Sequence, residues 1–133
     1  MPYSYYVSSP IRRMFPSPYK TKRARATIAT GTTDGAIASA PGAGYKIVVT
    51  ALYSNCGATA TSLTLNSKPV GAGTAISHAL THAANGFNHL TRNLDGWFEC
   101  AENEGLTGTT SAAGASIGVT VVYMIVPATW TPA

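Results

Sequence analysis

The sequence is poor in charge. Charged residues make up only 11% of the chain, well below the roughly 25% that is usual in soluble domains. Gly, Ala, Ser and Thr are correspondingly abundant. A surface with so few charges is typical of a protein that lies against neighbouring molecules. Because the chain has 133 residues, we expect one domain, large enough to bury about two-thirds of its unfolded surface.

Cysteine is scarce as well, since the chain has only Cys56 and Cys100. Two cysteines are too few for a disulfide framework or a metal-binding set. We expect two small, buried, reduced thiols, and a pairing between them stays open because it depends on the fold.

Targeting and membrane signals are also lacking. The first residues are tyrosines and prolines where a secretory signal would have an apolar stretch. The longest apolar run, residues 119–126, is too short to span a membrane. We therefore expect no membrane partner, and synthesis and assembly in a cytoplasm.

Acidic residues are absent from the first 25 positions, which hold six of the nine basic residues of the chain. The remaining residues carry three basic side chains against five acidic ones, so the basicity belongs to one terminal segment. The six basic residues are Arg12, Arg13, Lys20, Lys22, Arg23 and Arg25.

The same segment is rich in proline and aromatic residues. Prolines at 2, 10, 16 and 18 interrupt both helices and sheets, and disordered tails are usually poor in aromatics. We therefore predict that residues 1–25 form an extended arm that lies on a partner surface. Its aromatic anchors are Tyr3, Tyr5, Tyr6, Phe15 and Tyr19.

Helical periodicity is missing beyond one or two turns, and period-two alternation takes its place. Residues 44–54, 61–67 and 115–127 alternate apolar and polar side chains and are rich in β-branched and aromatic types. In the first run we expect the odd positions from Tyr45 to Tyr53 to share one face. Gly/Ser/Asn/Pro clusters recur about every ten residues, so we predict an antiparallel β-sandwich or jelly roll over residues 26–133.

The last predicted strand is apolar on both faces towards its end. Ile117, Val119 and Val121 lie on one face, while Val122, Met124 and Val126 lie on the other. A strand with two apolar faces is covered on both sides. We therefore predict an oligomer interface at Val122, Met124 and Val126, in a rotationally symmetric homo-oligomer.

Each candidate catalytic or metal-binding group can also be explained by a structural role. A nucleophilic Cys100 would need a nearby base and a lowered pKa, and as part of a strand it is a core residue beside Phe98. The acids at 95, 99, 102 and 104 have no fixed pairing or calcium loop, so we expect solvated loop acids. Histidines 78, 82 and 89 lack the glutamate of a zinc-protease motif, so we expect exposed or interface histidines. We predict no enzyme, no metal and no cofactor.

The basic arm leaves two kinds of partner open. Arginine, lysine and tyrosine could track a nucleic acid, but six charges are few, and prolines suit a strap on a protein. An acidic protein surface would attract the arm equally well. We expect a protein partner rather than nucleic acid.

The order of strands and turns resembles small β-sandwich domains in virion proteins of tailed bacteriophages, of the capsid decoration (cement) or head-fibre type. The resemblance covers roughly residues 26–127. The elements that carry it are "GYKIVV" at Gly44–Val49, "SLTLN" at Ser62–Asn66, "AANG" at Ala83–Gly86, "GWFE" at Gly96–Glu99, "EGL" at Glu104–Leu106 and the terminal run Ser111–Val126.

This resemblance implies a binding and scaffolding role, commonly in a trimer. We expect a decoration protein that binds the major capsid protein on the outer surface of a phage head and bridges capsomers. The arm at 1–25 would act as the strap. The alternative is a tail or fibre appendage domain that binds a host glycan receptor.

Overall fold

The computed structural model describes residues 19–111 and 114–132. Its strands are β1 (Thr21–Ile28), β2 (Gly35–Ala38), β3 (Tyr45–Cys56), β4 (Thr61–Lys68), β5 (Thr74–Ala75), β6 (Leu80–His82), β7 (Phe87–Leu90), β8 (Phe98–Glu99), β9 (Gly105–Thr110) and β10 (Ile117–Pro127). In these two ranges there is no helix, and hence none long and apolar enough to cross a membrane.

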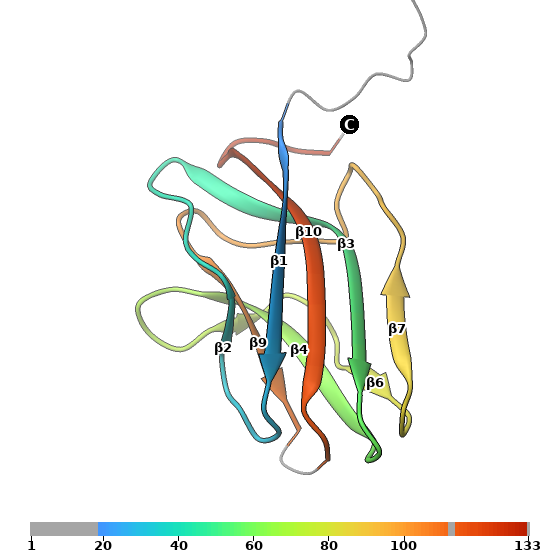
Figure 1. The fold of residues 1–133 in the computed structure, drawn as a ribbon. Coiled ribbons are helices and arrows are strands. Elements are labelled where there is room, and N and C mark those ends of the chain that lie inside the picture. The colour runs from blue at the N-terminus through green and yellow to red at the C-terminus, as the bar shows by residue number, and fades with distance from the viewer. Residues whose placement is uncertain (1–18, 112–113, 133) are drawn as a thin grey trace, which may run out of the picture.

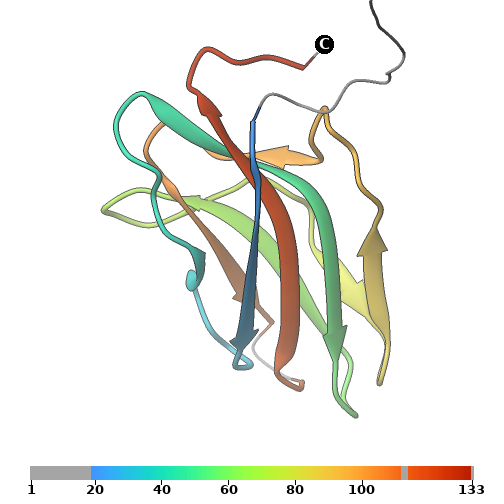
Figure 2. The same ribbon diagram turned by 45° about the horizontal axis from the view of Figure 1, so that its top comes forward.

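Two antiparallel five-stranded sheets pack face to face (Figure 1). Sheet A has the order β1–β10–β3–β7, with β8 also paired to β3, and sheet B has the order β2–β9–β4–β5, with β6 also paired to β4. The chain changes sheet at every connection except β4–β5, β5–β6 and β7–β8, as Figure 2 shows from a second angle. This connectivity is that of a jelly roll, so the predicted fold class is confirmed.

The core lies between the sheets and is almost wholly aliphatic. Ile47, Leu63, Leu65, Leu106 and Ile117 are fully buried there. Burial of each such side chain stabilises the fold by about 1.5–3 kcal/mol. These residues come from both sheets, so the core holds the two layers together.

The first strand begins at Thr21, inside the segment predicted to be an arm up to residue 25. β1 pairs with β10 along its whole length, from Thr21 opposite Met124 to Ile28 opposite Ile117. Ala24 and Ala26 pack against the core, and this alternation with exposed neighbours is typical of a strand. The sandwich therefore starts at Thr21 instead of residue 26.

An extra residue in β3 corrects the predicted faces of that strand. Val122 and Tyr123 of β10 pair with Ala51 and Val49, so Thr50 has no partner in the ladder. Such a β-bulge reverses the alternation beyond it. Leu52 is therefore buried and Tyr53 is 45% exposed, the reverse of the expectation that Tyr45 and Tyr53 share a face with the core residues.

The second apolar face of β10 is covered by the chain itself. Met124 and Val126 are 1% and 0% exposed and form a cluster with Val48, packed against Tyr19 and Trp130. The structure therefore corrects the predicted oligomer interface for Met124 and Val126, because a partner cannot reach them. For Val122, which is half-buried outside this cluster, the interface stays a prediction.

An ion pair closes this cluster at its edge. The Lys46 ammonium donates to the Glu99 carboxylate and lies 5.8 Å from the ring centroid of Trp130. A cation over an indole ring is attracted by the ring's quadrupole. The contact helps to fix the C-terminal segment on sheet A.

A buried polar pair crosses the core between the sheets. His82 of β6 is 2% exposed and Ser54 of β3 is 0% exposed, and the Ser54 Oγ lies 2.8 Å from His82 Nε2. The other ring nitrogen, Nδ1, is buried and has no hydrogen-bond partner within the part of the chain that the structure describes. This pair corrects, for His82 alone, the expectation that the histidines are exposed or at an interface, and Ser54 is the hydrogen-bond partner of its buried imidazole among the described residues.

The substitution Ser54→Ala tests how much this hydrogen bond contributes to the stability of the fold. We expect the free energy of unfolding to fall by about 1–3 kcal/mol, because the imidazole is left buried with neither nitrogen satisfied. Urea unfolding followed by circular dichroism measures the loss. The control Ser116→Ala, at an exposed position, should change stability by less than about 0.5 kcal/mol, and equal effects would contradict the assignment.

Candidate interaction surface

The outward face of sheet A is divided into a covered part and a bare part. The covered part is the apolar cluster beneath Trp130. We call the bare part the open half, and its residues follow from the pairing of β1, β10, β3 and β7. They are Arg23, Arg25, Thr27, Ala51, Tyr53, Asn55, Phe87, His89, Gly118, Thr120 and Val122.

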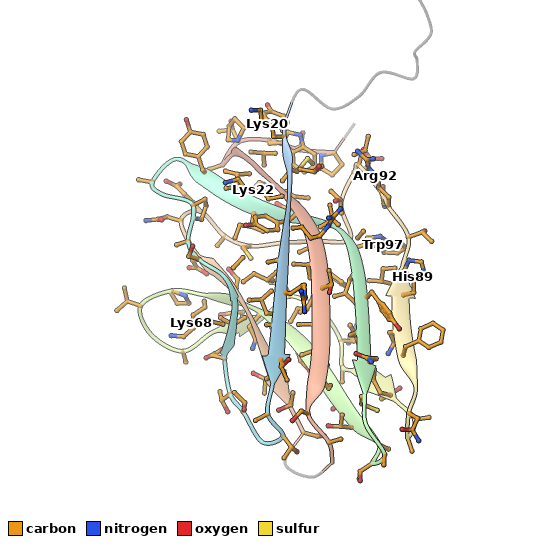
Figure 3. The ribbon with its side chains drawn as sticks, in the orientation of Figure 1. Lys20, Lys22, Lys68, His89, Arg92 and Trp97 are labelled. Atoms are coloured by element: carbon orange, nitrogen blue, oxygen red, sulfur yellow. The ribbon has the colours of Figure 1, made fainter. Side chains whose placement is uncertain are left out.

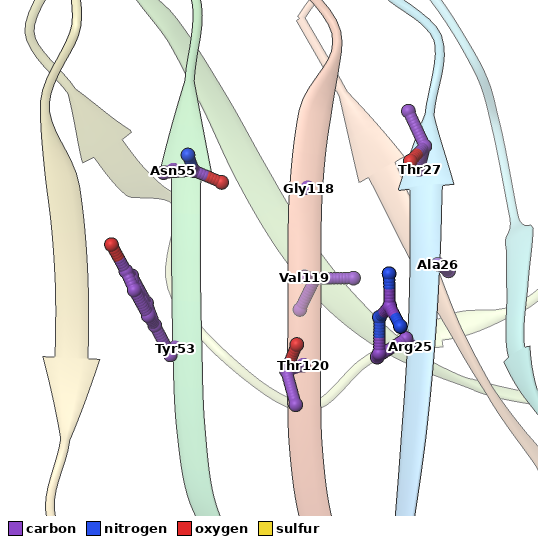
Figure 4. Close-up of a pocket in the computed structure, with 8 residues that line it drawn as sticks. All are labelled: Arg25, Ala26, Thr27, Tyr53, Asn55, Gly118, Val119 and Thr120. Atoms are coloured by element: carbon purple, nitrogen blue, oxygen red, sulfur yellow. The ribbon is translucent and has the colours of Figure 1, made fainter.

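A groove of about 600 Å³ runs over β10 in the open half (Figure 4). Arg25 and Thr27 of β1 line one side, and Tyr53 and Asn55 of β3 line the other. The floor is β10, where Gly118 has no side chain to fill the space. Neighbouring strands lie about 4.8 Å apart, so the two walls stand about 10 Å from each other.

Aromatic side chains crowd the β3 side of the groove. Tyr53 and Phe87 are 45% and 65% exposed, and their ring centroids lie 5.7 Å apart in an edge-to-face arrangement. His89 is paired with Tyr53 across β3 and β7, and the centroids of their two rings lie 6.3 Å apart. Exposed rings held against one another present a rigid apolar area to a partner.

The charge on the open half comes from arginine alone. Arg23 and Arg25 are exposed on β1, and none of the residues that define the open half is Lys, Asp or Glu. Lys22 lies on the opposite side of the strand, since it is paired with Tyr123. No carboxylate therefore lies among the residues of the open half to neutralise the two guanidinium groups.

Some of the predicted arm residues lie within the described part of the chain, and others lie outside it. Tyr3, Tyr5, Tyr6, Arg12, Arg13 and Phe15 lie outside the described residues. Tyr19 packs on the apolar cluster, Lys20 is exposed just before β1, and Lys22, Arg23 and Arg25 belong to β1. Figure 3 shows Lys20 and Lys22 at the upper end of β1. The structure thus brings Arg23 and Arg25 onto one face of sheet A with Tyr53, Phe87 and His89.

The two cysteines are buried and unpaired, as expected. Cys100 is 2% exposed in the core, and its thiol donates towards the Gly105 carbonyl oxygen at 3.8 Å. Burial raises the pKa of this thiol to about 11. The thiolate that a nucleophile requires is therefore disfavoured.

The acidic side chains hold loops in place. Glu102 accepts a hydrogen bond from the Gly44 N–H at 2.8 Å, and Glu104 accepts one from the Ser67 hydroxyl at 2.6 Å. Glu99 is paired with Lys46. These acids were expected to be solvated, and the structure gives three of them specific partners.

Asp34 is the most heavily bonded acid. Its backbone has φ 55°, a left-handed conformation that Asp and Asn tolerate best among non-glycine residues. Its carboxylate accepts from Gly73 N–H, Asn66 Nδ2 and Thr107 Oγ1 at 2.9–3.1 Å. It therefore ties the β1–β2 turn to the loop between β4 and β5.

Other predicted chemistry is not assembled in the described part of the chain. Within residues 19–111 and 114–132, no three His, Cys, Asp or Glu side chains gather as a metal site would need. His78 and His89 are exposed and His82 is buried. The Ser54–His82 pair has the residue types of a catalytic dyad, but both side chains lie in the core, where a substrate does not reach.

Comparison with known proteins gives little. No protein-family model and no curated protein matches the chain. Among solved structures, the cryo-EM structure of the virus-like particle of the extra small virus of the giant freshwater prawn Macrobrachium rosenbergii is similar over 94% of this chain and 93% of its own. The identity is 11% and the TM-score is 0.30, too low to carry an argument about fold or function.

Asp34 joins the β1–β2 turn to the loop between β4 and β5, and the stability that this contact gives the fold should depend on pH. The Gly73 N–H, with Thr107 and Asn66, lowers the pKa of Asp34 below 3.8 against the desolvation that raises it. A lowered folded-state pKa means that the carboxylate stabilises the fold above the unfolded pKa, and that this contribution is lost as pH falls through the folded value.

We therefore expect Asp34→Asn to lower the urea midpoint at pH 7, and the gap to the wild type to shrink below about pH 4. Asn keeps the left-handed backbone accessible, and the substitution removes the charge together with one acceptor oxygen. Asp95→Asn, at an exposed loop position, serves as control. A gap that is the same at pH 7 and pH 3 would contradict a role for the ionised carboxylate.

Burial of Cys100 predicts low thiol reactivity. In a Cys56→Ala variant, Cys100 should react with iodoacetamide at pH 8 at least about a hundredfold more slowly than free cysteine, because its thiolate is rare. After unfolding in urea the same thiol should react at the free rate. Mass spectrometry counts the labelled fraction, and rapid labelling of the folded protein would reopen a nucleophilic role.

Proposed function

We propose that this chain is a virion structural protein that decorates a capsid. It binds the major capsid protein on the outer surface of a phage head and stabilises the head by bridging capsomers. The observation that carries the proposal is the open half, a bare sheet face with arginines and exposed aromatics. The thiols, the core histidine and most acids of the described residues are buried or engaged in holding loops.

The fold and the sequence resemblance support the same role. Jelly rolls are widespread in viral capsid and lectin domains, although a fold alone does not fix a function. The resemblance to phage decoration domains runs through the elements that form β3, β4, β9 and β10. Both considerations favour binding over catalysis.

The basic segment would supply a second contact with the head. Arg12, Arg13 and Lys20 precede β1, and Arg23 and Arg25 continue the positive charge onto sheet A. An acidic capsid surface would attract this strip, which speeds encounter and sets orientation. The strap of the proposal is thus residues 1–20, with β1 as part of the body.

A homotrimer is part of the proposal, with a contact other than Met124 and Val126. Those two side chains are enclosed by Tyr19 and Trp130 of the same chain. Val122 is half-buried and lies outside the residues that line the groove, so it stays available for this contact. Light scattering of the purified protein measures the oligomeric state.

Deletion of residues 1–18 tests the strap. The sandwich begins at Thr21, so we expect its urea midpoint to be unchanged, while binding to isolated heads of the virus that encodes the chain falls at least tenfold. Co-sedimentation of the protein with heads measures the binding. A deletion variant that binds at full strength would show that the strap is dispensable.

Electron microscopy of labelled virions distinguishes the two roles weighed for this fold. A decoration protein is expected on the head, at regular capsomer positions. Label confined to the tail or to fibres would favour a host glycan-binding appendage and would overturn the capsid role.

A further inference from the structure

The open half has the composition of a protein-binding surface. The cores of protein–protein interfaces are enriched in Tyr, Phe, Trp and Arg and depleted in Lys, Glu and Asp. Arg23, Arg25, Tyr53 and Phe87 follow this bias, and no Lys, Asp or Glu is among the remaining members. The most costly residues to truncate at interfaces are also Tyr, Trp and Arg.

Arginine specifies the chemistry of the partner more closely than lysine would. The guanidinium is a planar fork that pairs with both oxygens of a carboxylate. Arg25 stands on one wall of the groove, across β10 from Tyr53 (Figure 4). A partner segment that carries a carboxylate and an apolar side chain side by side would satisfy both walls.

A nucleic acid fits this face less well. Its affinity comes from cations along the phosphate backbone, and the strand positions of the open half offer only two arginines. Thr27, Asn55 and Thr120, which also line the groove, are neutral. The balance of two charges and several rings suits a polypeptide better than a polyanion.

A second copy of the chain is also a poor source of the carboxylate. Four of the five acids of the chain are already held: Asp34 by Gly73, Glu99 by Lys46, Glu102 by Gly44 and Glu104 by Ser67. The fifth, Asp95, is a single exposed acid in the loop before β8. Because most of the chain's own acids already have partners, an acidic segment of a different polypeptide is the better source of the carboxylate.

The shape of the groove suits an extended segment. It is open along β10 and about 10 Å wide between its walls, and its floor is kept low by Gly118. A Cβ at Gly118 would lie 2.9 Å from the Asn55 Oδ1, so a larger residue would both fill the floor and displace a wall. A single extended chain can lie along such a channel with alternate side chains facing the sheet.

We propose that the open half of sheet A is the docking face for an extended acidic segment of a partner polypeptide. A carboxylate of the segment pairs with Arg25, and a neighbouring apolar side chain packs on Tyr53 and Phe87. The inference rests on the proposed function only for the partner's identity as the major capsid protein; the chemistry of the face stands apart from it.

The first experiment measures peptide binding to the open half in the absence of phage heads. The full chain is titrated with a fluorescein-labelled dodecapeptide in which Asp alternates with Leu, and binding is read by fluorescence anisotropy and by amide NMR shifts. We expect saturable binding that shifts the amides of Arg25, Tyr53 and Thr120. Arg25→Glu, Tyr53→Ala and Gly118→Val should each weaken it at least tenfold.

Lys22→Glu is the matched control for Arg25→Glu. It makes the same charge change on the same strand, at a position that faces the other way, and it should weaken binding less than threefold. Equal losses in the two variants would reduce the effect to net charge and overturn the docking face. So would equal binding of a Lys–Leu peptide, or tighter binding of a dT12 oligonucleotide or a heparin tetrasaccharide.

The second experiment adds isolated heads to the same variants. If Arg25→Glu and Tyr53→Ala bind heads as the wild type does, the docking face is wrong while the decoration role stands. If the peptide titration succeeds and no variant or wild type binds heads, the face stands and the capsid role is wrong. Loss of head binding in these variants, with Lys22→Glu unchanged, supports both.

Discussion

The unpaired Thr50 in β3 is the local irregularity on which the two faces of sheet A depend. Its side-chain hydroxyl donates to the Val122 carbonyl oxygen at 3.0 Å, and its own carbonyl accepts from the Asn93 N–H, so the extra residue is held in place. Beyond it, Leu52 and Ser54 turn inward and Tyr53 turns outward. The buried Ser54–His82 pair and the exposed ring of the open half are both consequences of this one inserted residue.

The N- and C-terminal ends of the described chain have a matching role on the same sheet. Tyr19 and Trp130 enclose Val48, Met124 and Val126, which would otherwise be an apolar patch of the kind that promotes association. The bare and the covered parts of sheet A are thus chemically distinct. One is closed by the chain itself, and the other keeps two arginines with no carboxylate among the residues of the open half.

Much of the fold could be predicted from the sequence because the signal is physical and local. The alternation of Ile117, Val119 and Val121 and the regular turns determine a sandwich. The bulge could not be predicted, because no residue type in the β-branched run shows where one extra residue is inserted. β9 was also missed: its Gly108 looks like a turn residue, yet a Cβ there would come within 2.8 Å of Leu63 and Ile28. The open half was missed because Arg25 and Tyr53 lie far apart in sequence and meet only through β10.

The contact of Tyr19 with the apolar cluster fixes the point at which residues 1–18 are joined to the sandwich. Fully extended, such a segment reaches about 60 Å at most, so its basic residues stay within a bounded distance of β1. If the segment and the open half engage the same partner lattice, the second attachment becomes intramolecular, and avidity can exceed either affinity by about 10²–10⁴. Two individually weak contacts would then suffice for near-permanent occupancy, and release would require both to open together.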